Sequence, residues 1–553
     1  MRFSKEVLGL FYTIFQKLSI YFHACAWGKA YWRMLLRLRV RRSRLQRFGT
    51  VGSRLGVGLL FLVAIRHLYY GFKLSSADAK FRAVKSSAQS LRAMQDSAGL
   101  SECFALLADR KDPGSDLCIR ANNFLSLLHA AGLVIPLPPG GNLFKRHGIC
   151  AGACFIATNV RDAQQVMPNY IYHLVLTVGS LTHYANPVFV SVYESGSKDR
   201  TADWLQVLGD VLDALSVPHR LELGGNIQRE KGEERIKFLA RVRSAALVPL
   251  FEQCNATGQF CAPSSDKSNS SGRIIFLNDV LFSAADIVRL LQYPADLVCG
   301  LDLGMAAEPD MTEQEHQATV AAYLRAKWLM PRYLAVQFSR LSFLSKRWRK
   351  YHHEHEPLFR DFGPLFFYDK WVARDISGRM FTNRSPYVVY QPSVDRVTGG
   401  RPVRVHCCWN GLAVINAEPF VQKVLDFREH REGECAASEC SLLCDDMWRL
   451  GYDNIIMDPN VRVTYDLAGV KKLFHALSTE LPLGAPGLAY SPFRQEEVRD
   501  VMSLPKHDDI SRESSNSDGH RTREVDCCDL KKGADMVEFR DPGVCHTSVL
   551  TLN

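Results

Sequence analysis

The chain carries little net charge once its first 54 residues are set aside. Those residues hold 12 of the 68 Lys and Arg side chains and one of the 58 acidic side chains, so they carry +11 and the remaining 499 residues carry −1. Proteins that bind nucleic acids more often carry their positive charge on the folded domain itself. The composition therefore argues against a nucleic-acid partner.

The chain also lacks paired C-x-x-C motifs, from which many zinc sites are built, so structural zinc is not expected. Fifteen of its 16 cysteines follow residue 72, and an oxidising compartment would allow disulfides among them. Cys103 with Cys118, and Cys254 with Cys261, could each close a small loop. The sequence does not settle the other pairings.

Long apolar runs are scarce as well. Leu55–Phe72 has 18 residues, near the lower limit for crossing a bilayer, and is interrupted by Arg66 and His67. The basic residues before it predict a cytoplasmic N-terminus and a single-pass anchor, with the rest of the chain in the secretory lumen. The alternative is a buried helix that follows a basic surface arm.

Composition and pattern divide the chain into five segments. Polar helices and a Pro/Gly-rich loop after the predicted anchor are typical of a stem, and the last residues are polar enough to be disordered or loosely attached. The segments are a basic cytoplasmic tail (1–54), the transmembrane anchor (55–72), a lumenal stem (73–145), a domain (146–490) with a helical insert (305–364), and a polar, partly disordered tail (491–553).

Apolar runs of strand length alternate with helical segments inside the predicted domain. Strands are predicted at 153–159, 188–194, 219–223, 274–277 and 296–302, and helices at 164–181, 202–215, 235–251 and 284–291. This alternation predicts an α/β fold, in which helices flank a mostly parallel, Rossmann-type sheet. The strand pattern resumes at 403–415, beyond the insert.

The strand Ile274–Leu277 ends in two polar residues, Asn278 and Asp279. An unpaired carboxylate is costly in a core, so we expect Asp279 at the carboxyl edge of the sheet, where ligands of open α/β sheets bind. The alternative is that Asp279 only caps the turn before the helix Ala284–Leu291.

A second polar motif follows the strand 188–194. Glu194, Ser197 and Asp199 lie in a turn rich in small residues at a helix N-terminus, which would offer backbone N–H groups to an anion. Asn159 ends the preceding strand. This pattern resembles nucleotide-sugar transferases with the GT-A fold, in which a later acidic motif, here Asn278-Asp279, holds a divalent metal against the donor diphosphate.

Five motifs are similar, in the same order, to those of the fungal cryptococcal mannosyltransferase family, glycosyltransferase family 69, which includes the capsule-associated proteins. The similarity covers about residues 153–465. Two features depart from the family pattern: the insert 305–364 is longer than expected, and Ser244 stands where Asn is expected, so the substrate could differ. The motifs are Phe276-Leu-Asn-Asp-Val280, Tyr368-Asp-Lys-Trp-Val-Ala-Arg-Asp-Ile-Ser-Gly378, Cys408-Trp-Asn-Gly411, Ser438-Glu-Cys-Ser-Leu442 and Asp458-Pro-Asn-Val-Arg-Val463.

The resemblance implies an α-1,3-mannosyltransferase with a GT-A-like fold, which uses GDP-mannose and a divalent metal such as Mn²⁺ and retains the sugar configuration. It further implies a type II protein of the Golgi or another secretory-pathway membrane, and a glycan or glycolipid acceptor in fungal polysaccharide or glycoconjugate synthesis. Two alternatives remain open. The donor could be another nucleotide sugar, or the chain could be a catalytically silent scaffold of a glycan-synthesis complex.

The chemistry of the leaving diphosphate suggests roles for the residues, because a metal and oriented cations stabilise its growing charge. Asp279 is expected to bind the metal, since hard cations prefer carboxylates. Glu439 is expected to serve the acceptor, and Trp409 to stack on sugar in a tight loop with Asn410 and Gly411. The remaining donor contacts are expected from Asn159, Glu194, Ser197, Asp199, Asn278, Arg374, Asp375 and Arg462.

Each of these roles has a structural alternative. Trp409 could be an ordinary core aromatic, and Glu439 could be an acid that only stabilises a helix N-terminus. Arg374 and Asp375 could form a structural pair. The sequence does not decide between these readings and the functional ones.

Overall fold

The computed structural model describes residues 75–111, 114–137, 153–257, 272–305, 365–465, 494–504, 513–515, 521–531 and 543–552, with isolated residues between these ranges. The chain divides into two compact units, residues 1–79 and 80–553, and the second unit is described below. No helix among the described residues is long and apolar enough to cross a membrane. The predicted anchor Leu55–Phe72 and most of the insert 305–364 lie outside the described residues.

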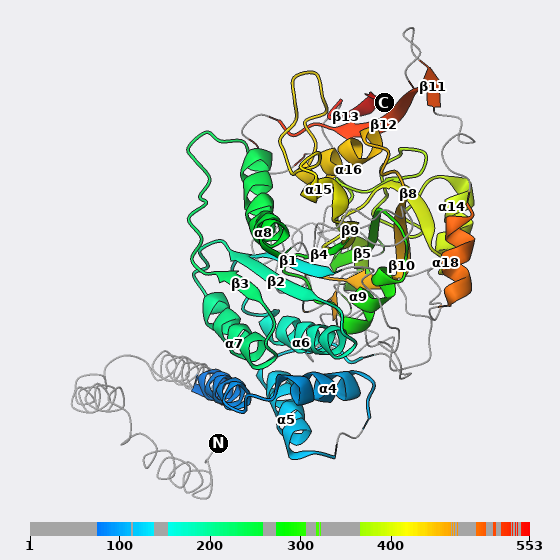
Figure 1. Ribbon diagram of the computed structural model, residues 1–553. Helices are drawn as coiled ribbons and strands as arrows, with labels where there is room; N and C mark the ends of the chain where they lie inside the picture. Colours follow the sequence, from blue (N-terminus) through cyan, green and yellow to red (C-terminus); the bar gives the residue numbers. More distant parts are fainter. Residues whose placement is uncertain are drawn as a thin grey trace, which may run out of the picture. The chain divides into compact units, whose positions relative to one another are not determined.

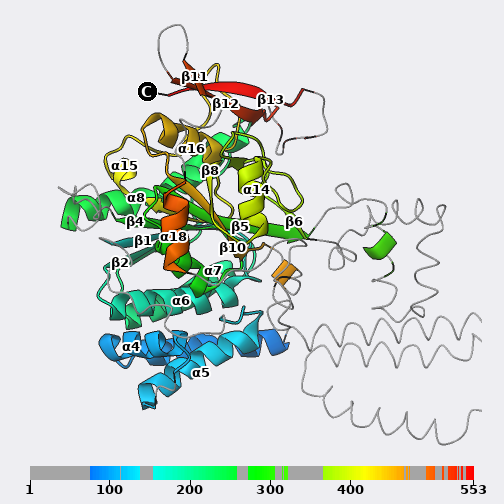
Figure 2. The same cartoon turned by 90° about the vertical axis from the view of Figure 1, so that its right-hand side faces the viewer.

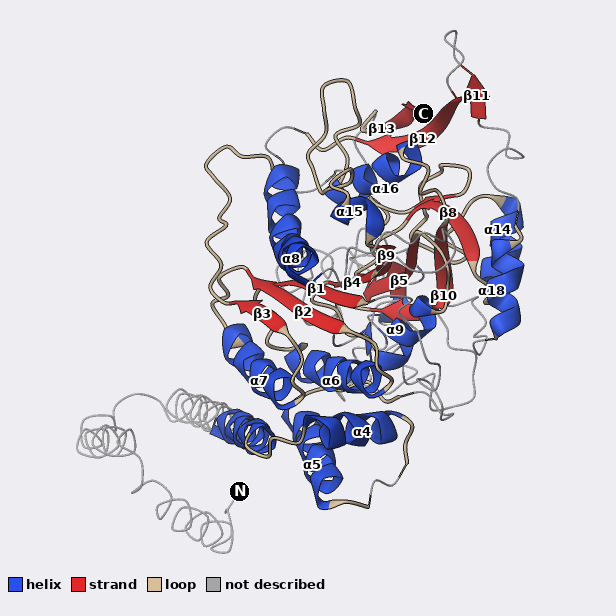
Figure 3. Cartoon of the chain, viewed as in Figure 1, coloured by secondary structure: helices blue, strands red, loops and turns tan. Residues whose placement is uncertain are grey.

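A mixed sheet of ten strands forms the centre of the second unit (Figures 1 and 3). The strand order is β3-β2-β1-β4-β9-β5-β10-β8-β7, and β6 pairs with β5. The strands are β1 (Cys154–Val160), β2 (Val188–Glu194), β3 (His219–Glu222), β4 (Arg273–Leu277), β5 (Leu297–Met305), β6 (Leu365–Phe367), β7 (Arg374–Asp375), β8 (Val403–Cys407), β9 (Leu412–Asn416) and β10 (Ile455–Val463).

The predicted α/β sheet is confirmed, and most of its strands run in one direction. The pairs β3–β2, β2–β1, β1–β4 and β5–β10 are parallel, whereas β9 runs antiparallel to both neighbours, β4 and β5. The carboxyl ends of β1 to β5 and β10 therefore meet at one edge of the sheet. The predicted run 403–415 is divided into β8 and β9, which the turn at 408–411 separates.

Helices cover both faces of the sheet (Figure 2). Alternate residues of β1 and β4, such as Ile156 and Phe155, belong to two different core clusters, as expected for a sheet buried on both sides. One face is covered by α6 (Met167–His183), α7 (Thr201–Ala214) and α9 (Ala284–Leu291), and the other by α8 (Arg235–Thr257) and α16 (Glu439–Arg449).

The part of the predicted stem that belongs to the second unit packs on α6. Helices α4 (Ser97–Ala108) and α5 (Asp116–Ala131) bury Phe104 and Phe124 in the same core cluster as α6 and α7. A Cβ atom at Gly179 of α6 would lie 2.7 Å from the Cβ atom of Phe104, so this helix contact needs glycine. These helices thus share the core of the sheet domain, which a separate stem would not do.

The two ends of the insert lie side by side. Strands β5 and β6 form an antiparallel pair in which Met305 is opposite Leu365. The chain therefore leaves and re-enters the sheet at neighbouring positions, which leaves the strand order intact around the insert. This finding explains why a strand pattern is recognisable in the sequence on both sides of residues 305–364.

The folded unit extends beyond residue 490, where the sequence prediction placed its end. Strands β12 (Arg521–Cys528) and β13 (Cys545–Thr551) pair along their whole length, together with the short β11 (Glu513–Ser515), and α18 (Gln495–Met502) buries Val498 and Val501. Disulfide Cys435–Cys527 attaches this segment to the domain, and disulfide Cys528–Cys545 joins β12 to β13 within it. Its polar composition hid this order, because covalent links replace part of the apolar core that a free tail would need.

One of the suggested cysteine pairs is confirmed, since Cys103 and Cys118 form a disulfide. Cys254 is disulfide-bonded as well, and Cys261, its suggested partner, lies outside the described residues. Two further disulfides, Cys299–Cys408 and Cys407–Cys444, lie next to the carboxyl edge of the sheet. The only cysteine with a free thiol in the described part of the chain is the buried Cys440.

Candidate active site

Asn278 is the centre of a polar network at the end of β4. Its backbone N–H donates to the carbonyl of Gly411 (2.9 Å), and its Nδ2 donates to the Tyr465 hydroxyl (2.8 Å). Its Oδ1 accepts from Nη1 of Arg243 (3.0 Å) and, more weakly, from Nε1 of Trp409 (3.5 Å). One amide side chain thus joins four segments of the chain.

Arg243 brings a fixed positive charge to this network from the middle of α8. Its Nε donates to Oε1 of Glu439 at 2.7 Å, and its guanidinium carbon lies 4.8 Å from the centre of the Trp409 ring. The Arg243 side chain is 14% exposed, whereas that of Glu439 is 2% exposed. The Arg243 side chain therefore has partial contact with solvent, while the Glu439 carboxylate that pairs with it is buried.

The tight loop that was predicted at Trp409-Asn410-Gly411 is present. Asn410 and Gly411 both have positive φ angles, 54° and 75°. A Cβ atom at Gly411 would lie 2.7 Å from Cγ1 of Val280, so only glycine fits beside the end of β4. Asn410 fixes the loop to β5 because its Nδ2 donates to the carbonyl of Gly300 at 2.7 Å.

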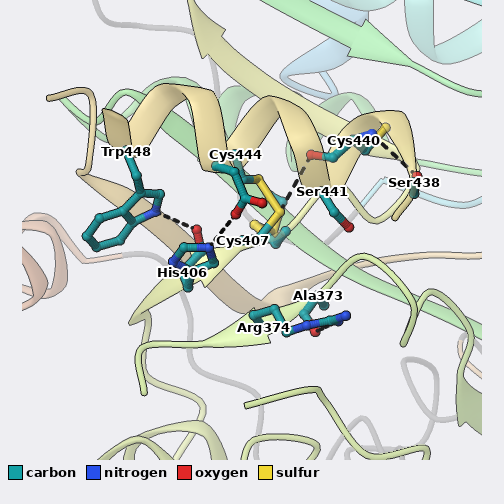
Figure 4. Close-up of a disulfide and its surroundings, with 12 residues drawn as sticks. Ala373, Arg374, His406, Cys407, Ser438, Cys440, Ser441, Cys444 and Trp448 are labelled. Carbon is teal, nitrogen blue, oxygen red and sulfur yellow. Dashed lines mark hydrogen bonds and ion pairs between the residues drawn. A yellow bond between two sulfur atoms is a disulfide. The ribbon is translucent and has the colours of Figure 1, made fainter. Parts of the chain in front are cut away.

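Two disulfides hold this loop from neighbouring positions. Cys408 is bonded to Cys299 in β5, and Cys407 is bonded to Cys444 in α16. Figure 4 shows the second bond, which joins the end of β8 to the helix that begins with Glu439. The disulfide Cys407–Cys444 therefore connects the loop to the helix that carries Glu439, the partner of Arg243.

The placement of Trp409 corrects its expected role as a sugar platform. Its ring is 1% exposed and packs against Phe276 and Phe427, with centroid distances of 4.9 and 5.5 Å, while Arg243 lies over it. No ring face is left for a sugar. The structural alternative, a core aromatic, describes Trp409 better, and its contact with the site is through Arg243 and Asn278.

Three carboxyl groups, those of Asp279, Asp302 and Asp369, lie near enough to Tyr465 for their negative charge to raise its pKa. Burial raises the pKa of Asp279 and Asp302, and it raises the pKa of Asp369 to about 6. Burial, followed by the charges of Asp302 and Asp279, raises the pKa of Tyr465 well above its usual value. The site thus concentrates acidic groups in a place where their charge is unfavourable without a counter-charge.

Asp302 has an unsatisfied atom of the kind that a cation or proton would satisfy. Its Oδ1 accepts from the backbone N–H of Asp369 (3.2 Å), but its buried Oδ2 has no hydrogen-bond partner among the described residues. Carboxylate oxygens are the preferred ligands of hard divalent cations. The Asp279 carboxyl and this orphaned oxygen are therefore groups of the chemical kind that a divalent metal prefers.

Among the described residues, the one group of three possible metal ligands that lie within reach of one another is Cys435, Cys527 and Asp529. Its two sulfur atoms are joined in a disulfide, so neither is available as a thiolate ligand.

The four residues that were predicted after β1 and β2 lie at the same sheet edge, but they mainly hold their own loops. Glu194 accepts from the backbone N–H groups of Ser197 and Gly224, and Asp199 accepts from that of Gln164 (3.0 Å). Ser197 Oγ accepts from the Asp162 N–H at 2.8 Å. Asn159 donates to the Val242 carbonyl (2.8 Å), and its buried Oδ1 has no hydrogen-bond partner among the described residues.

Arg374, Asp375 and Arg462 form structural contacts away from the Asn278 network. Nε of Arg374 donates to the Asp526 carbonyl at 2.6 Å, and burial lowers the pKa of this side chain to about 10. Asp375 is fully buried and accepts from the backbone N–H groups of Val389 and Tyr390 at 2.9 and 2.8 Å. Nε of Arg462 donates to the Pro459 carbonyl at 2.8 Å. These contacts give all three residues a structural role, which the sequence had suggested as an alternative only for Arg374 and Asp375.

The sequence reasoning missed several residues of the site: Arg243, Asp302, Asp369 and Tyr465. Some signals were available. Tyr368 and Asp369 open one of the family motifs, Asp302 ends a predicted strand, and Arg243 precedes the unusual Ser244. In the structure the hydroxyl of Ser244 donates to Oδ1 of Asp426 at 2.8 Å, so this substitution retains a polar contact.

Comparisons with known proteins agree with the motifs. The family described as cryptococcal mannosyltransferase 1 matches residues 153–446, more than half of the chain. Alpha-1,3-mannosyltransferase CMT1 of Cryptococcus neoformans var. neoformans serotype D is 26% identical over 336 residues, which are 57% of this chain and 58% of that protein. The chain thus spans somewhat over half the length of this relative.

A search of solved structures gives a weaker likeness. The crystal structure of GalNAc-T7 with UDP, GalNAc and Mn²⁺ shares 12% sequence identity with the chain and covers 57% of this chain and 43% of its own, with a TM-score of 0.27. A likeness at this level carries no argument about the site.

Proposed function

Because the chain belongs to the cryptococcal mannosyltransferase family, we propose that it is a glycosyltransferase that moves mannose from GDP-mannose to a glycan or glycolipid acceptor. The relative's name suggests an α-1,3 linkage, which corresponds to retention of the sugar configuration. The family resemblance of the motifs and the polar network at the carboxyl edge support the same reading. The GT-A fold remains part of this proposal.

The observation that carries the proposal is the fixed charge of Arg243. A nucleotide-sugar diphosphate gains negative charge as the glycosidic bond breaks, and a preorganised cation stabilises that charge. Arg243 is held by Glu439 and Asn278 and braced against aromatic rings, so little reorganisation is needed during the reaction. Asn278 also fixes the chain at the end of β4, directly before Asp279.

We further propose that a divalent metal, Mn²⁺ in the simplest case, is held by Asp279 and by the orphaned Oδ2 of Asp302, since the charges of both carboxyl groups act on Tyr465. When bound, such an ion would neutralise the diphosphate and the buried carboxylates together. The Tyr465 hydroxyl accepts a hydrogen bond from Asn278 and so helps to fix the end of β4 next to Asp279. No residue is assigned as a covalent nucleophile.

A donor screen with the full-length chain in detergent tests this function. We expect mannose transfer from GDP-mannose with Mn²⁺, and a loss of at least about 10²-fold with a chelator, as for removal of a preorganised electrostatic contact. If the protein transferred sugar only from UDP-sugars or from other GDP-sugars, the proposed donor would be wrong and the proposed enzyme class would stand. If the protein neither transferred nor hydrolysed any nucleotide sugar, that result would support the alternative of a catalytically silent scaffold.

The disulfides support a secretory location for the domain, because buried disulfides form and persist in oxidising compartments. We propose a type II protein of the Golgi or another secretory membrane, anchored through Leu55–Phe72. Protease treatment of sealed vesicles is then expected to remove only the basic tail, residues 1–54. Digestion of the remainder without detergent would contradict this topology.

A further inference from the structure

Tyr368 exposes its ring beside the polar network. Its fractional exposure is 59%, and it is the only aromatic residue among the strongly exposed large apolar side chains of the described part of the chain. An exposed aromatic ring gives up the free energy of burial, roughly 25 cal/mol per Å² of apolar surface. Such a ring next to polar groups is typical of a ligand contact.

The backbone fixes Tyr368 at the carboxyl end of β5. Its N–H donates to the carbonyl of Asp302 at 3.1 Å, and the next N–H, that of Asp369, donates to Oδ1 of the same residue at 3.2 Å. The residue before it, Phe367, belongs to β6, which pairs with β5. Tyr368 is therefore part of the rigid sheet edge.

The ring of Tyr368 connects this edge to Asn278. Its centroid lies 5.3 Å from that of Tyr465, with the planes inclined at 47°. The hydroxyl of Tyr465 accepts from Nδ2 of Asn278 at 2.8 Å. An exposed aromatic face thus stands one ring away from the proposed reaction centre, with the carboxyls of Asp302 and Asp369 next to it.

The strand order assigns the two sides of the centre to different substrates. The loops after β1 and β2, with their Ser/Gly turn at the start of α7, lie on one side of β4, and Tyr368 lies on the other side, beyond β9 and β5. A nucleotide that uses the first side leaves the second side free for the acceptor. This step rests on the proposed function.

We propose that Tyr368 is the stacking platform for the acceptor sugar. One face of a pyranose ring presents C–H groups and packs against an aromatic ring, whereas its hydroxyl groups need hydrogen-bond acceptors. Tyr368 supplies the ring, and the half-buried carboxyl of the next residue, Asp369, supplies an acceptor. Tyr368 therefore takes the role at the site edge that Trp409, being buried, does not fill.

The test compares Tyr368→Ala, which removes the ring, with Tyr368→Phe, which keeps it. Full-length protein is assayed with GDP-mannose and with methyl α-mannoside and α-1,3-mannobiose as acceptor probes, and its melting temperature is measured. We expect Tyr368→Ala to raise the acceptor KM about tenfold, the upper range for one aromatic contact. The donor KM, the hydrolysis of GDP-mannose by water and the melting temperature should stay near wild type, and Tyr368→Phe should behave as wild type.

Three results would overturn the assignment: an unchanged acceptor KM in Tyr368→Ala, a rise of the donor KM in parallel with the acceptor KM, or an equal loss in Tyr368→Phe, which would indicate the hydroxyl. The failure of the proposed function has a different signature. In that case the wild-type protein neither hydrolyses GDP-mannose nor mannosylates either probe, and the inference falls with it.

Discussion

The variant Asp279→Asn is expected to transfer mannose 10²–10³-fold more slowly than the wild type at saturating Mn²⁺ and donor, the usual cost of losing one preorganised electrostatic contact. Asn keeps the size of the side chain but removes the charge that would hold the metal. Mn²⁺ binding without donor, followed by calorimetry, should weaken as well. This second measurement does not depend on activity.

The thermal stability of this variant should hold or rise in the absence of ligand. Burial raises the pKa of Asp279, so the folded state binds the proton more tightly than the unfolded state does. The ionised group then destabilises the fold at any pH above its unfolded-state pKa, and stability increases as the pH falls. Replacement by the neutral Asn removes this penalty at neutral pH.

Asp286→Asn is a matched control. This carboxyl is also buried, with a pKa raised to about 7, but it accepts from the Ser283 N–H (2.8 Å) in the capping box of α9. We expect wild-type transfer and Mn²⁺ binding from it, since the side-chain oxygen of Asn can still accept from the Ser283 N–H. Wild-type activity of Asp279→Asn itself would favour the turn-cap alternative and remove the metal-site reading.

The second large effect is expected from Arg243→Lys. Lysine keeps the positive charge, but its single ammonium group does not reproduce the planar fork that donates to Glu439 and Asn278 together. Transfer should fall by about 10²–10³-fold. The free energy of unfolding should fall by about 1–3 kcal/mol, below the range for breaking a fully buried pair because Arg243 is partly exposed.

Arg241→Lys controls for the helix and the charge. Arg241 lies two positions before Arg243 on the same helix and pairs with Glu233 at 3.1 Å, outside the network. Its substitution should change stability by no more than about 0.5 kcal/mol and leave transfer unchanged. If Arg243→Lys behaved in the same way, the arginine would have no part in catalysis.

Glu439→Gln separates two roles for the acid. The sequence predicted a group that serves the acceptor, and in that case transfer should fall while donor binding stays near normal. The ion pair instead favours a residue that positions Arg243. If so, Glu439→Gln should weaken donor binding and stability in parallel with Arg243→Lys, because both variants leave the guanidinium misplaced.

The periodic elements were predictable because their pattern is local. β2 and α9 begin and end where the sequence placed them, and β4 differs by one residue. Strand-length runs bounded by polar residues, and the Ser283 cap before an amphipathic turn, are signals that lie within about ten residues. The position of β9 between β4 and β5 has no such signal, since it depends on pairing across the whole sheet.

The site was less predictable because its contacts join distant segments. The ion pair of Arg243 and Glu439 links residues that are 196 positions apart, and the contact of Asp302 with Asp369 spans 67 positions. The sequence shows that an acid, Asp279, follows a strand. It does not show that α8 brings Arg243 to the end of the same strand. For the same reason Arg374 was expected at the donor, although it holds the C-terminal strand.

The attachment of the C-terminal strands has a consequence for how the protein is made. Cys435 pairs with Cys527, and the carbonyls of Asp526 and Cys528 accept from Arg374 and from Nε1 of Trp371, a few residues after Asp369. Chains fold from the N-terminus during synthesis, so these partners arrive last. A nascent chain therefore completes the surroundings of its site only after residues 526–528 have been translated and exposed to oxidant.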